Sequence, residues 1–210
     1  MKTKAVLLDA LGTLVELEPP WVHLSAELGT DADEGMVKAV RVEMDYYKQH
    51  AHEGTDAQAL ADLRDRCAGV LTRELGRDVS VEQMMGAIRF RAYPDAPPAL
   101  EALRSRSLRL VCVANWDISL TDVLERCGVL EPLEGVVTSA AAGARKPDPA
   151  IFGVALGVAG VAASEAVHVG DTEEEDVAGA RAAGIPVLLL DRAGGADIAS
   201  LGDVVERLEA

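Results

Sequence analysis

The sequence is poor in aromatic residues and in basic charge. Aromatic side chains make up 3% of its 210 residues, so Ala, Val and Leu must build the core, and no platform for stacking nucleotide bases is expected. Acidic residues outnumber lysine and arginine by 35 to 20, a formal net charge of −15. Because nucleic-acid binding requires a clustered basic face, this balance argues against a nucleic-acid partner. The overall composition, 49% hydrophobic and 26% charged, is typical of a folded globular protein.

Cysteines are also few, and no apolar run is long. Cys67, Cys112 and Cys127 lack CxxC spacing, which favours reduced thiols over a disulfide framework or a zinc site. The longest apolar stretch, residues 154–163, is about half the length that a membrane span requires. The N-terminal apolar run resembles a weak signal peptide. However, Asp9 interrupts the run, and no small-residue cleavage site for a signal peptidase follows promptly. We therefore expect a cytoplasmic protein without a membrane partner.

Short runs rich in Val and Leu recur along the chain. Runs of this kind are typical of strands buried on both faces of a parallel sheet. Helical patterns lie between the later runs, and one of them begins at Pro149 after the predicted N-cap residue Asp148. The alternation of strand and helix predicts an α/β fold with a Rossmann-like parallel sheet as its core. The predicted strands are residues 5–8, 108–113, 135–138, 167–169 and 187–190.

The connection between the first two of these strands breaks the alternation. It holds helical patterns and no convincing strand, and a connection this long must carry its own structure. We therefore predict two domains: an α/β core formed by residues 1–15 and 91–210, and an all-helical cap formed by residues 16–90. The predicted helices of the cap are residues 21–28, 33–50, 55–75 and 81–89.

Polar residues follow the predicted strands at the points where each strand ends. Ligands bind at the carboxyl ends of the strands in an open α/β sheet, so these side chains should meet in one crevice. Two carboxylates, an amide, hydroxyls and a lysine suit a divalent cation that holds an anionic substrate, with one carboxylate left as a nucleophile. The residues are Asp9, Asn115, Thr138, Ser139, Lys146 and Asp171.

Four segments of the sequence resemble the motifs of the haloacid dehalogenase superfamily. Residues 9–14, Asp-Ala-Leu-Gly-Thr-Leu, resemble its nucleophile motif, and residues 111–117 resemble its second motif. Residues 146–149, Lys-Pro-Asp-Pro, resemble the third, and the acidic run of residues 170–176 resembles the fourth. A single DxxGT pattern is weak evidence, but four motifs in the correct order are specific. The resemblance covers essentially the whole chain.

This resemblance implies a Mg²⁺-dependent phosphatase that acts on a small phosphorylated compound. It implies that Asp9 is the nucleophile, which forms an aspartyl-phosphate intermediate, and that Lys146 is a second catalytic residue. It also implies two sets of binding residues: Asp9, the Leu11 carbonyl, Asp171 and, behind it, Asp176 for the metal, and Thr13, Asn115 and Lys146 for the phosphate.

Two positions depart from the phosphatase pattern and leave alternatives open. Leu11 replaces the usual general acid, whose contribution is typically about 10²–10⁴-fold in rate, and Ala114 replaces a usual Ser or Thr. One alternative is a metal-independent 2-haloacid dehalogenase. Such enzymes bind substrate through an arginine early in the cap, whereas the first arginine after Asp9 here is Arg41. The other alternative is a degenerate member that binds a phosphorylated ligand without appreciable turnover.

A few further ionisable residues are candidates for supporting roles. His23, Lys48 and His50 belong to the predicted cap, where each is expected at the surface unless cap closure brings it to the crevice. His168 lies within a predicted apolar strand, which favours a core histidine with satisfied hydrogen bonds.

Overall fold

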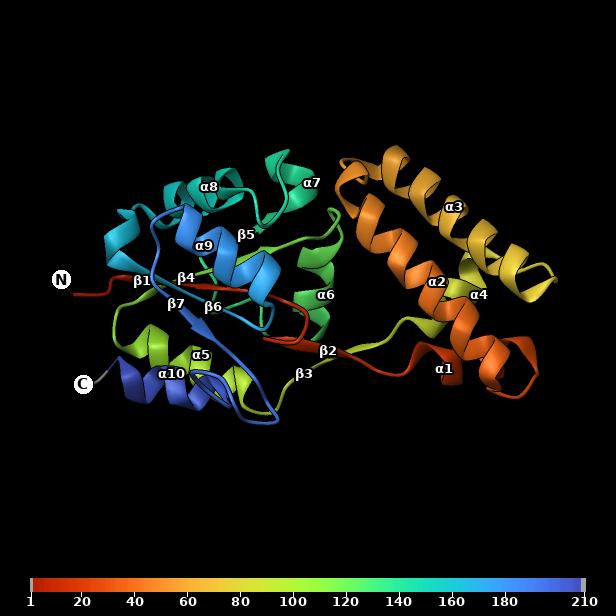
Figure 1. The fold of residues 1–210 in the computed structure, drawn as a ribbon, viewed down its shortest axis with the longest axis horizontal. Helices are drawn as coiled ribbons and strands as arrows, with labels where there is room; N and C mark the ends of the chain where they lie inside the picture. Colours follow the sequence, from red (N-terminus) through yellow and green to blue (C-terminus); the bar gives the residue numbers. More distant parts are fainter. Residues whose placement is uncertain (1, 209–210) are drawn as a thin grey trace.

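The computed structural model describes residues 2–208 and centres on a five-stranded parallel sheet (Figure 1). The strand order is β5-β4-β1-β6-β7. The central strand β1 pairs with β4 on one side and with β6 on the other, so its backbone is enclosed by the sheet. The predicted α/β fold with a parallel sheet is confirmed. The strand bounds are β1 Ala5–Leu8, β4 Arg109–Ala114, β5 Gly135–Thr138, β6 Ala166–Gly170 and β7 Val187–Leu189.

Helices cover both faces of this sheet. Val6 and Leu8 of β1 are buried on one face, and Ala5 and Leu7 are buried on the other, because successive side chains of a strand point in opposite directions. Both faces therefore require apolar residues, which explains the continuous apolar runs in the sequence. The first face packs against α5 Ala96–Ser105, α6 Leu120–Arg126 and α10 Leu201–Arg207, and the second against α8 Pro149–Ala159 and α9 Ala178–Ala182.

The helix starts follow local capping chemistry. Asp148 accepts a hydrogen bond from the backbone N–H of Ala150 and Pro149 follows it, which confirms the predicted start of α8. Thr138 caps α7 (Ser139–Ala142) in the same way. After β6, a π-helical turn, η3 (Glu173–Val177), leads directly into α9. A short 3₁₀ turn, η2 (Ala163–Glu165), leads into β6.

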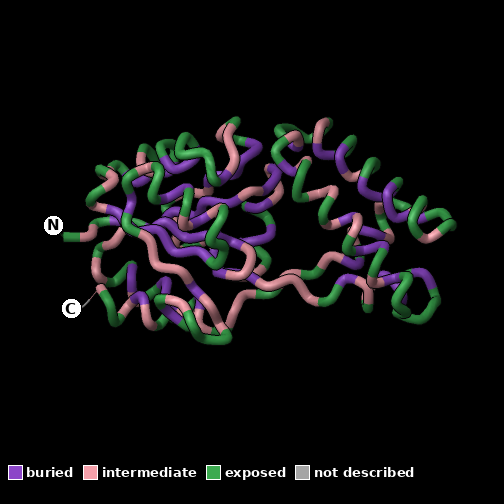
Figure 2. Tube along the Cα trace, in the orientation of Figure 1, coloured by how far each residue is buried: buried purple, intermediate pink, exposed green. Residues whose placement is uncertain are grey.

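Four helices between β2 and β3 pack around their own hydrophobic cluster, apart from the sheet (Figures 1 and 2). We call this group the helical insertion. Its members are α1 Pro20–Leu28, α2 Glu34–His50, α3 Ala57–Leu75 and α4 Val81–Ala87, with the 3₁₀ turn η1 Ala51–Glu53 between α2 and α3. The cluster includes Leu24, Met36, Leu63, Leu71 and Met84. Figure 2 shows the buried residues of these helices on their mutually facing sides, as the amphipathic sequence patterns require.

A two-stranded antiparallel ribbon joins the helical insertion to the sheet domain. It consists of β2 (Val15–Leu17) and β3 (Phe90–Ala92), and an ion pair between Glu16 and Arg91 at 2.9 Å lies across it. The expectation that this stretch holds no strand is wrong. Three residues are too few to show a periodic pattern, and the pairing arises because the outgoing and returning chains run side by side. Within residues 2–208, no helix has the length and apolar character needed to cross a bilayer.

Candidate active site

Three carboxylates meet at the carboxyl edge of the sheet. Asp9 directly follows β1, and Asp171 and Asp176 follow β6, its neighbour in the sheet. One carboxylate oxygen from each of the three residues lies within 4.8 Å of the other two. Asp9 and Asp176 are buried and Asp171 is exposed, so the cluster has an inner wall and an open side. The structure thus brings together the acidic residues that the sequence pointed to.

Lys146 completes this cluster from the loop between α7 and α8. Its side chain is 1% exposed, and its ammonium donates hydrogen bonds to Asp9 Oδ1 at 2.5 Å and to Asp176 Oδ1 at 2.6 Å. A buried ammonium without partners would be strongly unfavourable, so these two contacts are what allow Lys146 to be buried here. Lysine is scarce in the sequence, with five residues in all, so a lysine in this loop is conspicuous.

Asn115 holds the backbone of Lys146. Its Oδ1 accepts a hydrogen bond from the Lys146 N–H at 2.7 Å, and its Nδ2 donates to the Lys146 carbonyl at 3.0 Å. Because Asn115 follows β4, this pair of hydrogen bonds fixes the Lys146 loop to the sheet. The amide is engaged with the protein in this structure, and its predicted contact with phosphate stays a prediction.

His168 supports the cluster from within β6. Its Nε2 lies 2.8 Å from Asp176 Oδ1, and its Nδ1 lies 3.1 Å from the carbonyl oxygen of Leu7. The ring packs edge-on against Phe152 and is fully buried. The prediction of a satisfied core histidine is confirmed, but the sequence did not indicate that one of its partners is Asp176.

Burial and mutual charge shift the titration of these groups. Burial, together with the charges of Asp176 and Asp171, raises the pKa of Asp9 to about 7, although Lys146 acts in the opposite direction. Burial alone would lower the pKa of Lys146, but Asp9 and Asp176 more than offset it and raise that pKa. Burial alone would raise the pKa of Asp176, but Lys146 and His168 hold it well below its usual range. Lys146 and Asp176 are therefore both charged near neutral pH.

Gly12 and Thr13 lie in the turn that follows Asp9. Gly12 has φ +90°, and a Cβ atom there would overlap the Asp171 carboxylate, so glycine is required for this close approach. The Thr13 side chain is fully buried, and its hydroxyl has no hydrogen-bond partner among the described residues. Leu11 packs against the hydrophobic core. A buried hydroxyl without a partner is costly, which suggests that a ligand satisfies it.

Several other candidate residues are engaged elsewhere. The Thr138 hydroxyl accepts from the backbone N–H of Ala141, and the Ser139 hydroxyl donates to the carbonyl of Trp116, so both serve the start of α7. In the helical insertion, His23 lies 2.8 Å from Glu18 and His50 lies 2.7 Å from Glu53. Lys48 is exposed.

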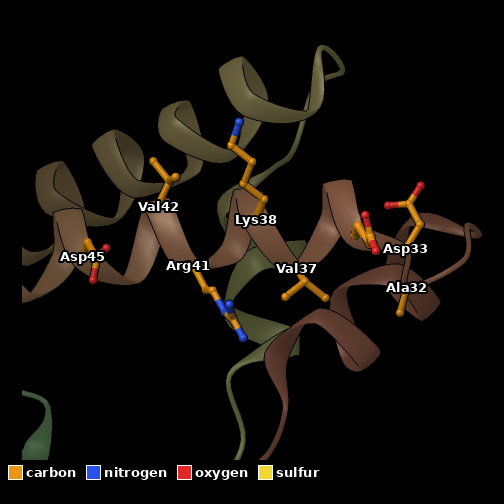
Figure 3. A pocket seen from close by; sticks show the side chains of 8 residues that line it. Ala32, Asp33, Val37, Lys38, Arg41, Val42 and Asp45 are labelled. Atoms are coloured by element: carbon orange, nitrogen blue, oxygen red, sulfur yellow. The ribbon is translucent and has the colours of Figure 1, made fainter.

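A separate shallow pocket lies on α2 of the helical insertion (Figure 3). Arg41, the arginine weighed above for substrate binding, is exposed and lines this pocket together with Val37, Lys38, Val42 and Asp45. None of the carboxylates in the cluster around Lys146 lines it. The pocket carries charges of both signs, and its chemistry differs from that of the acidic cluster.

A carboxylate held beside a lysine at the carboxyl ends of parallel strands is the arrangement expected of an α/β enzyme with a nucleophilic carboxylate. The family model described as haloacid dehalogenase-like hydrolase matches residues 3–184. The chain belongs to this family. The resemblance inferred from the four motifs is confirmed.

Curated relatives are similar to this chain over only part of their own length. Haloacid dehalogenase-like hydrolase domain-containing protein 3 of Bos taurus is 35% identical over 149 residues, which cover 70% of this chain and 54% of that protein. Phosphoserine phosphatase of Thermus thermophilus is 38% identical over 105 residues, which cover 50% of this chain and 42% of that protein. The chain spans about half the length of these curated relatives.

Solved structures match over nearly the whole chain. A HAD phosphatase from Thermococcus onnurineus superposes with a TM-score of 0.70 at 26% identity, covering 99% of this chain and 98% of that one. A 2-haloacid dehalogenase from Pseudomonas syringae superposes with a TM-score of 0.65, with the same identity and coverage. The fold is therefore shared by proteins of both names, and the side chains of the site must distinguish the two chemistries.

Proposed function

We propose that this protein is a Mg²⁺-dependent phosphatase that hydrolyses a small phosphorylated compound through an aspartyl-phosphate intermediate on Asp9. The observation that carries the proposal is the cluster of three carboxylates around the buried Lys146, and an unpartnered, buried hydroxyl, that of Thr13, follows Asp9 in the adjoining turn. The similarity to a phosphoserine phosphatase and to a HAD phosphatase supports the same chemistry.

The residues present fit a magnesium ion. Mg²⁺ prefers oxygen ligands and is usually bound by one or two carboxylates, together with water and substrate phosphate. Asp9 and Asp171 would supply those carboxylates, the Leu11 carbonyl would supply a neutral oxygen, and Asp176 would add negative charge behind them. Gly12 allows the Asp171 carboxylate to lie against the turn that follows Asp9, because any side chain at position 12 would overlap Asp171. When bound, the ion would neutralise charge on the transferring phosphoryl group.

The protein residues divide the remaining work. A carboxylate oxygen of Asp9 attacks phosphorus, the bond to the leaving oxygen breaks, and water later hydrolyses the aspartyl phosphate to regenerate Asp9 and release phosphate. Lys146 offsets the negative charge of the phosphoryl oxygens, and the Thr13 hydroxyl donates to one of them. Asn115 holds Lys146 in place through its backbone, in addition to any contact of its own with phosphate.

The helical insertion would act as the cap, comprising residues 16–90 on a core of residues 1–15 and 91–210. The paired crossing strands β2 and β3 support this division, because they are the two covalent connections between the parts. A cap that closes over the carboxyl edge of the sheet would exclude water and select the substrate.

The decisive experiment is a hydrolysis screen of phosphorylated metabolites with and without Mg²⁺. Hydrolysis that requires Mg²⁺ and is lost in Asp9→Asn is the expected result. Glu174→Gln, a change in the exposed part of the acidic run, is the matched control and should leave turnover intact. Binding of phosphorylated compounds without turnover would instead support a degenerate, ligand-binding member of the family.

A 2-haloacid dehalogenase is the second candidate. Leu11 favours it, because no side chain at that position can protonate a leaving alkoxide, and departing halide needs no proton. The similar structure from Pseudomonas syringae points the same way. The clustering of three carboxylates argues for a cation and against a metal-independent reaction. Halide release from 2-haloacids in the presence of a chelator would support this candidate and overturn the phosphatase proposal.

A further inference from the structure

Arg192, in the loop after β7, contacts the backbone of the turn that follows Asp9. Its Nη2 donates to the carbonyl of Thr13 at 2.7 Å, and its Nε donates to the carbonyl of Gly12 at 3.2 Å. These residues are about 180 positions apart in the chain. Arg192 therefore binds the backbone of this turn. The glycine of the turn packs on Asp171, and the hydroxyl of its threonine is unpartnered.

The same guanidinium is held on its other side by the chain returning from the helical insertion. Its Nη1 lies 3.0 Å and 3.1 Å from the two carboxylate oxygens of Asp95, and its Cζ lies 3.5 Å from the centre of the Tyr93 ring. Asp95 also accepts from the backbone N–H of Leu201, at the start of α10. The carboxylate and the ring thus fix the orientation of the guanidinium before it meets the two carbonyls.

The returning chain also contacts the turn directly. The backbone N–H of Tyr93 donates to the carbonyl of Leu14 at 3.0 Å. Three consecutive carbonyls of the turn, those of Gly12, Thr13 and Leu14, therefore accept hydrogen bonds from residues outside the turn. The turn's own hydrogen bonds, such as Gly12 N–H to the Val15 carbonyl at 2.9 Å, act from within.

We propose that Arg192 is a positioning residue for the reaction, which sets the turn of residues 10–15 against the Asp9 and Asp171 carboxylates. It touches neither carboxylate and acts through the Gly12 and Thr13 carbonyls. The catalytic consequence rests on the proposed phosphatase function, whereas the structural consequence does not. Displacement of a catalytic group by about 1 Å can reduce a rate by roughly 10²-fold, so a loosened turn is enough to lower turnover.

Arginine is required here for geometric reasons. A guanidinium has five N–H groups in a rigid plane and can serve a carboxylate on one edge and carbonyls on another, while its face stacks on an aromatic ring. A lysine ammonium is a point charge on a flexible stem and cannot make these contacts at once. Arg192→Lys should therefore behave much more like Arg192→Ala than like the wild type.

The first test uses the metal-free protein and measures amide hydrogen exchange. Removing a hydrogen bond from a charged donor should accelerate local opening by about tenfold or more, so the amides of Gly12, Leu14 and Val15 should exchange faster in Arg192→Ala. The amides of β4 should not change. Arg104→Ala is the matched control, because Arg104 is an exposed arginine that pairs with Glu101 and Glu131. Unchanged exchange in the turn would overturn the proposal.

The second test is kinetic and uses a phosphorylated substrate with Mg²⁺. A displaced turn should lower kcat by about 10–100-fold, while KM changes by less than about threefold. A population of unfolded molecules would lower kcat but would not accelerate exchange in the turn alone. A rise in KM with kcat unchanged would overturn the positioning role, because it would indicate substrate binding by Arg192 itself.

Two further variants, Arg192→Lys and Asp95→Asn, keep the test decisive if Arg192→Ala does not fold. Asp95→Asn retains the side-chain shape but removes the charge that orients the guanidinium. Both should accelerate exchange in the turn, and Asp95→Asn should do so less than Arg192→Lys. The exchange experiment needs neither metal nor substrate, so it is independent of the phosphatase proposal. Accelerated exchange in a protein that hydrolyses no phosphate would support the placement of the turn by Arg192 and would count against the proposed function alone.

Discussion

The Tyr47 hydroxyl of α2 donates a hydrogen bond to Asp117 Oδ2 at 2.8 Å and thereby joins the helical insertion to the loop after β4. Asp117 is 3% exposed, and its other oxygen accepts from the Ser119 N–H at 2.6 Å. Next to this contact, the Ile118 N–H donates to the Gly54 carbonyl at 3.1 Å. Burial and the charge of Asp117 raise the pKa of Tyr47 well above its usual value, so the phenol remains a donor. The helical insertion is thus attached to the sheet domain at two places: the β2–β3 ribbon, and the end of α2 with the turn after it, which we call the tip of the insertion.

Tyr47→Phe should weaken this tip contact. A hydrogen bond to a charged group contributes about 1.5–3 kcal/mol, so the variant should lose a comparable part of its free energy of unfolding, or open locally at residues 51–54 and 117–118. Thermal unfolding and amide exchange measure the two outcomes. Tyr46→Phe is the control, because the Tyr46 hydroxyl accepts only an exposed bond from Arg66 at 3.2 Å. Equal effects of the two substitutions would contradict the importance of the Asp117 contact.

Asp171→Ala should remove magnesium binding. Outer partners of metal ligands alone change affinity by about 10–100-fold, and a direct ligand should contribute more. Calorimetric titration with Mg²⁺ should show binding to the wild type and a loss beyond that range in the variant, and Mg²⁺ should raise the Tm of the wild type by mass action. Glu174→Ala, an exposed neighbour in the same acidic run, is the control and should bind normally. Unaltered Mg²⁺ affinity in Asp171→Ala would show that Asp171 is not a ligand.

Stability of the metal-free protein should depend on pH through Asp9. The pKa of Asp9 is about 7 in the folded protein and 3.8 in its ordinary environment, so folding binds a proton between these values. The stability contributed by this protonation is fully present below about pH 4 and is lost as the pH rises through 7. The Tm of the wild type should therefore fall relative to that of Asp9→Asn as the pH rises.

The measurement for this prediction is thermal unfolding of both proteins in chelator from about pH 5 to pH 8. A change of 1 kcal/mol shifts the Tm of a domain of this size by roughly 2–4 °C, so a change of several degrees in the difference is expected. The charge of Asp171 contributes to the raised pKa of Asp9, so the difference between the two proteins reports Asp9 together with its coupling to Asp171. A constant difference across the range would contradict the proton uptake assigned to Asp9.

Because Leu11 cannot donate a proton, kcat/KM should fall steeply as the leaving group becomes more basic. With no side chain to protonate the departing oxygen, alkyl phosphates should lose most of the ~10²–10⁴-fold that acid catalysis supplies, whereas acyl and aryl phosphates need little help. Leu11→Asp should restore alkyl phosphates selectively, and Leu11→Asn, which cannot donate a proton in this way, is the matched control. The measurement is kcat/KM over a series of leaving groups. A flat series in the wild type would assign the proton to another group, such as His23, Lys48 or His50.

The main components of the site were predictable because they depend on local rules. Asp9, Asn115 and Asp171 each stand directly after a strand, and parallel strands end at one edge of a sheet. Lys146 was recognisable from its motif and from the scarcity of lysine. The ribbon of β2 and β3 was not predictable, because each strand has three residues and gains its partner only when the rest of the chain brings the two together.

The sequence alone determined which apolar runs form the core and which chemical groups are available. Apolar runs without polar alternation predict strands covered on both faces, and four motifs predict the family and locate Asp9 and the acidic run. Only the tertiary structure decided which group contacts which. Asp176, and not Asp9 alone, accepts from the Lys146 ammonium, and His168 contacts Asp176 from behind. Arg192 reaches a turn about 180 residues away because β1, β6 and β7 lie side by side. Hydrogen bonds and ion pairs act over a few ångströms, so the order of strands in the sheet selects the partners, and that order differs from the order along the chain.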